Sequence, residues 1–307
     1  MMTESNRKGE HLMQKVIAID CGGTNLRVAA VDEYLNILAV KRVPTVHDDP
    51  AKLYLTMKKL IDDVAAEAKI DVVSIGLSMC GIVVHNHVGK VGNLGILNGF
   101  DFVTLFAHDY PNAFLKIAND GNCSAFVEAK YGANKGFLDS AFITISTGIG
   151  LGIVHNGEMI DTPLEAGRLM TEYNGRLYET EALLSGNGLV TLCALNGIEI
   201  HSAKDFFDGV KAKDPKFIKV YNIWVGKLGV WLGNLQLLFD CQSYALSGGV
   251  MKSSDVFLED LQRIANASIA SWHLNPIILR DAKYKQDVGI AAAASLALHE
   301  LELQNIR

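Results

Sequence analysis

Between two short apolar segments, Val16–Ile19 and Leu26–Val31, lies the turn Asp20-Cys21-Gly22-Gly23-Thr24-Asn25, and Leu26-Arg27 follow it. Glycines between two adjacent apolar segments predict a β-hairpin rather than a crossover from a strand to a helix. Paired glycines also let the backbone turn tightly, so that its N–H groups can surround an anion beside the Thr24 hydroxyl. Two interpretations remain open at this point: a phosphate-binding turn and a plain hairpin turn.

A carboxylate, Asp20, ends the first of these two strands. A negative charge beside bound phosphates is favourable when Mg²⁺ lies between them, because Mg²⁺ takes few protein ligands and bridges carboxylates to phosphates. Asp20 is therefore the candidate metal ligand.

Two further glycine pairs follow strands. Thr147-Gly148-Ile149-Gly150 separates the predicted strands Ala141–Ser146 and Leu151–His155, and Ser247-Gly248-Gly249 follows Tyr244–Leu246. Neither the GxxxxGK[ST] loop nor a GxGxxG after the first strand is present in the sequence. The pattern favours phosphates held from two sides by hairpins, with a nucleotide base or ribose on the third glycine pair.

The remaining apolar patterns predict alternating strands and helices. The strands are Ile37–Arg42, Val72–Leu77 and Phe114–Ala118, and the helices are 50–69, 122–131, 181–194, 204–212, 216–239, 254–270 and 287–303. This order predicts an α/β fold in which helices cover the sheets.

The predicted strand Phe114–Ala118 ends in Asn119-Asp120, and a helix follows. Asp and Asn are common helix N-caps, which is one interpretation. The other is catalytic, because a carboxylate at such a junction can accept a proton from an attacking hydroxyl group. Farther along, Glu165, Arg168 and Glu181 are either surface charges or ligands that bind the hydroxyl groups of a neutral sugar.

Composition restricts the class of partner. The chain has 307 residues and a net charge of −6, which disfavours nucleic acid because phosphate-backbone binding needs a basic face. We find neither a secretory signal nor a long apolar span, and the five cysteines form no CxxC pair. We therefore expect a cytoplasmic protein that binds no membrane and has no disulfide framework.

Together these motifs resemble the ROK family of bacterial sugar kinases and related repressors, with glucokinases and allose kinases as the nearest patterns. Family motifs are matched by Asp20–Arg27, by Asn119-Asp120-Gly121-Asn122, by Thr147–Gly150, by Gly248-Gly249 and by Gly289–Ala293. The resemblance implies an α/β fold of the actin-like, hexokinase type, with two domains and a cleft between them. The domains would span 1–118 and 119–286, with a C-terminal helix at 287–307 returning to the first.

The resemblance also implies an activity and the residues that perform it. An ATP-dependent kinase would phosphorylate a hexose, with Asp120 as general base and Mg²⁺ at Asp20. Sugar ligands would be Asn93, Asn119, Asp120, Glu165, Arg168 and Glu181. Nucleotide ligands would be Asp20, Gly22, Gly23, Thr24, Asn25, Arg27, Thr147, Gly148, Gly248 and Gly249. Dimers are usual among relatives, so a homodimer is implied.

Two departures from the family pattern stand out. Where the family has Glu-x-Gly-His, this chain has Glu165-Ala166-Gly167-Arg168, and the cysteine cluster that normally follows is missing. We therefore expect no zinc, because a lone ligand without partners would hold no metal. The family's repressors carry a DNA-binding helix-turn-helix before the phosphate loop, and only 19 residues precede Asp20 here, which disfavours a repressor. The alternatives are a sugar-binding sensor without turnover and a phosphotransferase acting on a non-sugar.

Overall fold

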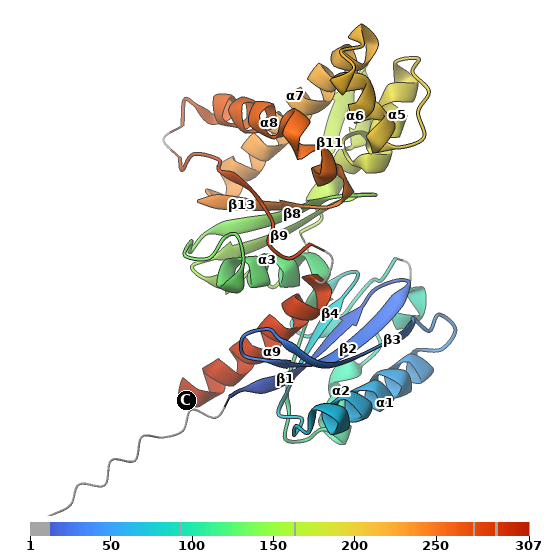
Figure 1. Cartoon of the computed structure of the whole chain (residues 1–307), viewed down its shortest axis with the longest axis vertical. Helices are drawn as coiled ribbons and strands as arrows, with labels where there is room; N and C mark the ends of the chain where they lie inside the picture. Colours follow the sequence, from blue (N-terminus) through green and yellow to red (C-terminus); the bar gives the residue numbers. More distant parts are fainter. Residues whose placement is uncertain (1–12, 93, 163, 273, 286–287, 307) are drawn as a thin grey trace, which may run out of the picture.

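The computed structural model describes residues 13–306 apart from 93, 163, 273 and 286–287. Two five-stranded sheets form two lobes, which are stacked along the long axis of the molecule (Figure 1). The first sheet has the strand order β3-β2-β1-β4-β7, and the second has the order β10-β9-β8-β13-β14.

The first lobe begins with the predicted hairpin. Its strands are β1 (Lys15–Cys21), β2 (Asn25–Asp32), β3 (Ile37–Pro44), β4 (Ser74–Met79) and β7 (Phe114–Asn119). β1 pairs antiparallel with β2, and β4 lies parallel between β1 and β7. Helices α1 (Pro50–Ala68) and α2 (Phe102–Asp109), the small strands β5 (Val83–Val84) and β6 (His87–Val88) and the 3₁₀ turn η1 (Gly95–Leu97) complete this lobe.

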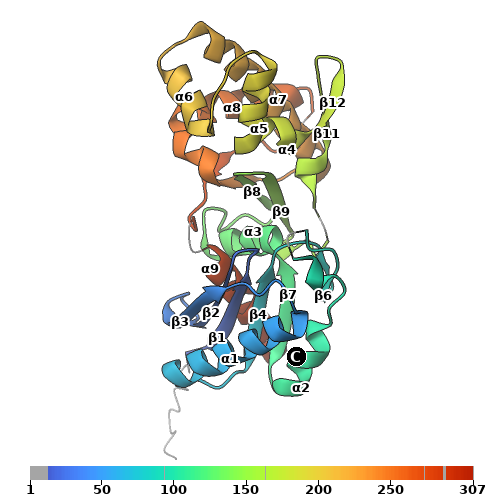
Figure 2. The ribbon, with the colours of Figure 1, turned by 90° about the vertical axis from the view of Figure 1, so that its right-hand side faces the viewer.

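The second lobe repeats the hairpin device. Its sheet contains β8 (Ser140–Ile145), β9 (Ile149–His155), β10 (Glu158–Met159), β13 (Ser243–Ser247) and β14 (Leu279–Asp281). β8 pairs antiparallel with β9 across the second glycine turn and parallel with β13. A separate antiparallel hairpin, β11 (Met170–Tyr173) and β12 (Arg176–Glu179), stands out at the edge of this lobe (Figure 2).

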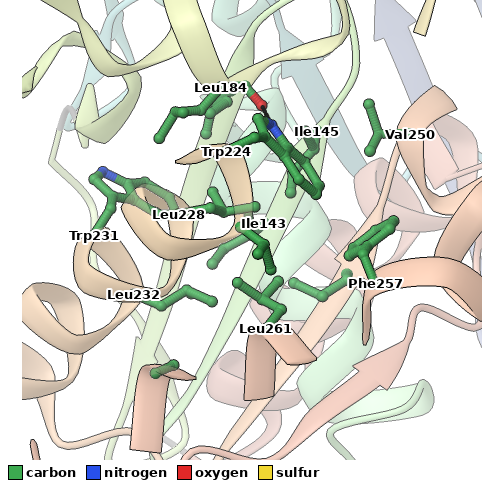
Figure 3. Packing of buried hydrophobic residues seen from close by; sticks show 14 of the residues in the cluster. Ile143, Ile145, Leu184, Trp224, Leu228, Trp231, Leu232, Val250, Phe257 and Leu261 are labelled. Carbon is green, nitrogen blue, oxygen red and sulfur yellow. Dashed lines mark hydrogen bonds between the residues drawn. The ribbon is translucent and has the colours of Figure 1, made fainter. Parts of the chain in front are cut away.

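Helices cover the second sheet. They are α4 (Thr180–Leu184), α5 (Gly186–Leu195), α6 (Ala203–Lys211), α7 (Pro215–Phe239) and α8 (Ser254–Ile269), with the 3₁₀ turns η2 (Ala166–Arg168) and η3 (Gly249–Ser253). Their core surrounds Trp224, whose indole N–H donates a hydrogen bond of 2.9 Å to the carbonyl of Leu184 (Figure 3). The buried side chains of this cluster hold β8 and β9 in place beneath the helices.

Helices α3 (Asp120–Tyr131) and α9 (Val288–Ile306) lie where the lobes meet (Figure 1). Phe126 of α3 and Leu296 of α9 belong to one buried cluster. α9 packs against the first sheet so closely that a Cβ at Gly76 of β4 would lie 1.9 Å from the carbonyl oxygen of Ala293. The C-terminal helix thus packs on the first sheet. The division into domains at 118/119, with this helix assigned to the first, stays a prediction.

Several predicted elements differ from the observed ones. The single helix predicted at 181–194 is wrong, because Ser185 ends α4 and caps α5, where its hydroxyl accepts the Gly188 N–H. The same hydroxyl donates to the carbonyl of Thr147 at 2.8 Å, so the break ties these helices to the second glycine turn. The strand predicted at Val72–Leu77 runs instead from Ser74 to Met79, because its pairing with β1 begins only at Ile75.

Candidate functional site

A cleft of about 790 Å³ lies between the lobes, and residues at the carboxyl ends of parallel strands line it. From the first sheet come Asp20 of β1, Ser78 of β4 and Asn119 of β7, and from the second come Thr144 of β8 and Ser247 of β13. Open α/β sheets commonly bind ligands at this edge, because the chain leaves each strand there in a loop. The cleft is therefore the candidate active site.

Asp20 is held in a fixed orientation at the end of β1. Its Oδ2 atom accepts hydrogen bonds from Nε and Nη2 of Arg27, at 2.9 and 2.6 Å, across the β1–β2 hairpin. On the other side, a Cβ at Gly289 would lie 2.3 Å from Asp20 Cγ, so α9 begins against this carboxylate. Both Asp20 and Arg27 line the cleft, and their contact with a nucleotide stays a prediction.

Asp120 opens α3 and faces the cleft. The cap of this helix is Asn119, whose Oδ1 accepts the backbone N–H groups of Gly121 and Asn122 at 2.8 and 3.3 Å. Capping by Asn119 leaves the Asp120 carboxylate available to the cleft, with one hydrogen bond of 2.9 Å from the Gly121 N–H. Asn119 is thus the helix cap, and the catalytic role of Asp120 stays a prediction.

The pKa of Asp120 is raised from 3.8 to about 6. Desolvation by the surrounding protein is the main cause, and the negative charges of Asp20 and Glu165 raise the pKa further. The hydrogen bond from Gly121 acts in the opposite direction. A carboxylate with a pKa near 6 is a stronger proton acceptor at neutral pH than an ordinary aspartate.

The start of α3 is locked against the second sheet. A Cβ at Gly152 of β9 would lie 2.2 Å from the carbonyl oxygen of Gly121, so only glycine allows this approach. The third glycine pair is similarly close to β8, because Gly248 has a φ of +100° and its Cβ would lie 2.3 Å from the Ile145 carbonyl oxygen. Gly248 and Gly249 both line the cleft opposite the first lobe.

The other predicted nucleotide ligands are not among the described residues that line the cleft. Gly22, Gly23, Thr24 and Asn25 form the turn of the first hairpin, beyond the residues that line the cleft. This turn is braced by Thr45, whose hydroxyl donates to the Gly22 carbonyl at 2.7 Å. Of the second turn, Ser146 and Gly150 line the cleft, whereas Thr147 and Gly148 do not.

The predicted sugar ligands are only partly brought together. Asn119, Asp120 and Glu165 line the cleft, whereas Arg168 and Glu181 are not among the described residues that line it. Glu181 instead accepts the Ile149 N–H at 3.1 Å, behind the second glycine turn. The prediction for Asn93 lies outside the described residues.

Two lysines that were not predicted from the sequence also line the cleft. Lys252 follows the third glycine pair in η3, and Lys285 lies just before α9, where it pairs with Asp281 at 3.2 Å. Lys252 could have been predicted as a ligand from the sequence. It lies three residues after Gly249, and a cation beside a glycine turn is typical of phosphate sites.

Other classes of site are not evident in the residues that the structure describes. None of the described helices has the length and apolar character needed to cross a membrane. Nor do the described His, Cys, Asp and Glu side chains gather in a group of three or more that could hold a metal ion. All five cysteines are free thiols. The expected lack of zinc stays a prediction.

Comparison with known proteins gives consistent matches along the chain. The family model described as ROK family matches residues 16–300. The beta-glucoside kinase of Listeria innocua is 26% identical over 93% of this chain and 98% of its own length. The N-acetylmannosamine kinase of Salmonella newport is also 26% identical, over 92% of this chain and 97% of its own.

Solved structures match the fold. The ROK hexokinase from Thermus thermophilus has a TM-score of 0.81 and 23% identity, covering 94% of this chain and 99% of that chain. A ROK family glucokinase from Streptomyces griseus was solved with glucose and AMPPNP. It has a TM-score of 0.68 and 21% identity, and the match covers 93% of this chain and 100% of that chain. The predicted α/β fold, with two lobes and the actin-like arrangement of hexokinases, is thereby confirmed.

Proposed function

The chain belongs to the ROK family, and from this premise we propose that it is an ATP-dependent kinase that phosphorylates a hexose or a hexose derivative. The family resemblance of its motifs is confirmed by that match. One observation supports the activity most directly. The Asp120 carboxylate, with its raised pKa, shares one cleft with Asp20 and with the third glycine pair, Gly248-Gly249.

In the proposed reaction Asp120 accepts the proton of a sugar hydroxyl group. The hydroxyl oxygen forms a bond to the γ-phosphorus of ATP while the bond from that phosphorus to the β–γ bridging oxygen breaks. The proton moves to the Asp120 carboxylate, the phosphoryl group to the sugar and the electron pair of the broken bond to ADP. Phosphoryl transfer needs mainly positioning and charge stabilisation, which two lobes around one cleft can provide.

Nucleotide binding is assigned to the side of the cleft that the glycine turns and cations occupy. Gly248 and Gly249 offer bare backbone for the base or ribose, and Arg27 and Lys252 bring positive charge. The turns at Gly22-Gly23-Thr24-Asn25 and Thr147-Gly148 would approach the phosphates from two sides. Closure of the lobes over the nucleotide would exclude water and limit wasteful hydrolysis.

The residues in the cleft fit a magnesium ion brought in with ATP. Asp20 and Asp120 both present carboxylate oxygen to the cleft, and the negative charge of Asp20 acts on Asp120. Mg²⁺ is commonly held by one or two carboxylates together with substrate phosphates. Asp20 would hold the ion, which would neutralise the charge that develops on the phosphates.

The sugar is assigned to the side of Asn119, Asp120 and Glu165. Carboxylates accept hydrogen bonds from sugar hydroxyls, and an amide both donates and accepts. Asn93 stays a proposed sugar ligand from the family resemblance, whereas Arg168 and Glu181 contact each other and are not among the described residues that line the cleft. We also propose that the protein is a cytoplasmic homodimer. Light scattering would measure its mass in solution.

The decisive experiment is an ADP-release assay with a panel of sugars, comparing the wild type with Asp120→Asn. Glucose, N-acetylmannosamine and a β-glucoside belong in the panel because relatives are named for related substrates. At least one sugar should stimulate ADP release by the wild type. Asp120→Asn should lower kcat by about 10²- to 10⁴-fold, because proton acceptance is lost.

Thermal melting and binding of an ATP analogue serve as controls for that variant. Unchanged melting and retained nucleotide binding would assign the loss to chemistry rather than to folding. Full activity of Asp120→Asn would contradict the role of Asp120, whichever sugar is used.

The second candidate function is a sugar-binding sensor without turnover. A ROK family transcriptional regulator matches 95% of this chain with a TM-score of 0.77, and this chain covers 80% of it. The same panel separates the two functions. Sugar binding measured by thermal shift, without any sugar-dependent ADP release, would favour the sensor.

A further inference from the structure

Arg168 bridges two carboxylates beside the second glycine turn. Its Nη1 atom lies 2.6 Å from Glu179 Oε2, and its Nη2 atom lies 3.6 Å from Glu181 Oε1. The other oxygen of Glu181, Oε2, accepts the backbone N–H of Ile149 at 3.1 Å. A continuous chain of contacts therefore runs from Arg168 through Glu181 to the start of β9.

Glycines make this arrangement close-packed. A Cβ at Gly148 would lie 2.5 Å from Glu181 Oε2, and one at Gly167 would lie 2.4 Å from the Ile149 carbonyl oxygen. Little free space thus separates the turn at Gly148, the 3₁₀ turn that holds Arg168 and the first turn of α4. A shift of the Glu181 side chain would be transmitted directly to the glycine turn.

The same 3₁₀ turn also carries the cleft residue Glu165. The backbone N–H of Arg168 donates to the Glu165 carbonyl at 2.9 Å, and the indole N–H of Trp231 donates to the Ala166 carbonyl at 3.1 Å. The segment is therefore anchored to the core, and Arg168 connects it, through Glu181, with the second glycine turn.

We propose that Arg168 is a positioning residue for phosphoryl transfer, which fixes Glu181 and through it the Thr147–Gly150 turn that faces the nucleotide phosphates. This inference rests on the proposed kinase function. Arg168 also compensates the charge of Glu181, which would otherwise repel the phosphates from behind the turn. Arginine suits this task because its planar guanidinium can contact two carboxylates at once, whereas a lysine ammonium is a point charge.

The proposal differs in its consequences from direct contact between Arg168 and the sugar. A sugar ligand affects KM for the sugar, whereas a residue that positions the phosphate turn affects KM for ATP and kcat. Steady-state kinetics with both substrates varied therefore separate the two roles.

The test compares Arg168→Gln with Arg176→Gln, which changes an exposed arginine on β12, the strand whose Glu179 contacts Arg168. Arg168→Gln should raise KM for ATP and lower kcat, with a combined loss in kcat/KM for ATP of about 10- to 100-fold. Its KM for the sugar should stay within about twofold of the wild type, since a positioning role leaves the sugar contacts in place. Arg176→Gln should match the wild type, and Arg168→Lys should fall between Arg168→Gln and the wild type because it keeps the charge.

A double variant supplies a readout that a merely structural role would not give. Glu181→Gln keeps an oxygen for the Ile149 N–H but removes the uncompensated charge. Arg168→Gln combined with Glu181→Gln should therefore bind an ATP analogue more tightly than Arg168→Gln alone. A rise in sugar KM with unchanged ATP kinetics, or equal behaviour of the Arg168 and Arg176 variants, would overturn the proposal. Absence of turnover in the wild type would instead refute the kinase function itself.

Discussion

The acidity of Asp120 sets the pH range in which the proposed reaction can run. Desolvation by the surrounding protein raises its pKa to about 6, so the carboxylate form that accepts a proton predominates at neutral pH and is lost on acidification. The same shift has a cost for folding. Because the pKa is above its ordinary value of 3.8, the fold favours the protonated form, and the stability that Asp120 contributes declines as pH rises through about 6.

The pH dependence of kcat/KM for the sugar provides the corresponding prediction. Below a pH of about 6 the rate should fall roughly tenfold per pH unit, because only the ionised Asp120 accepts the proton. The midpoint should lie about two units above that of an ordinary aspartate. A profile that stays flat down to pH 4.5, in a protein that remains folded by circular dichroism, would show that Asp120 is not the base.

At the scale of elements, the contact between β9 and α3 positions the Asp120 carboxylate, which we propose as the base. Gly152 of β9 faces the carbonyl of Gly121, the residue that follows Asp120. Gly152→Ala would force the strand and the helix apart, since overpacking of this kind typically costs about 1–3 kcal/mol. We expect a melting temperature lower by several degrees and reduced kcat, because the first turn of α3 has to move.

Gly226→Ala is the matched control for that substitution. Gly226 lies inside α7, and an added Cβ there would meet nothing within 4 Å. Since alanine is favoured over glycine inside helices, this variant should be as stable as the wild type or more stable by about 0.5–1 kcal/mol. Equal melting temperatures for the two alanine variants would contradict the close packing at Gly152.

At the scale of the whole molecule, a buried carboxylate ties the returning chain to the lobe junction. Glu128 of α3 is fully buried, and its two oxygens accept the backbone N–H groups of Ala133 and Tyr284 at 2.6 and 2.7 Å. Tyr284 belongs to the segment that leads from the second sheet into α9. A direct link between the lobes is the ion pair of Lys116 on β7 with Asp161, at 2.7 Å.

Glu128→Ala should therefore destabilise the protein strongly. Two backbone N–H groups lose their acceptor, and each such loss costs about 1–3 kcal/mol when the group stays buried. Glu259→Ala, on the exposed face of α8, is the control and should stay within about 0.5 kcal/mol of the wild type. Urea unfolding measures both free energies, and similar midpoints for the two variants would refute the role assigned to Glu128.

Local sequence determined much of this protein: both glycine hairpins, the strand that ends at Asn119 and the start of a helix near Asp120. Glycine pairs and apolar periodicity act over a few residues, so the chain itself records them. The small hairpin β11–β12, helix α2 and the break at Ser185 were not predicted. The break depends on the bond between Ser185 and Thr147, which are far apart in the chain.

Only the tertiary structure decided which of the candidate residues meet. It placed Asp20, Asp120 and Glu165 in one cleft and added Lys252, whereas it turned Glu181 toward Ile149 and gave Arg168 two carboxylate partners. It also brought Gly289 against Asp20, across most of the chain length. Such contacts depend on how sheets and helices pack, because packing joins side chains whose separation along the chain carries no local signal.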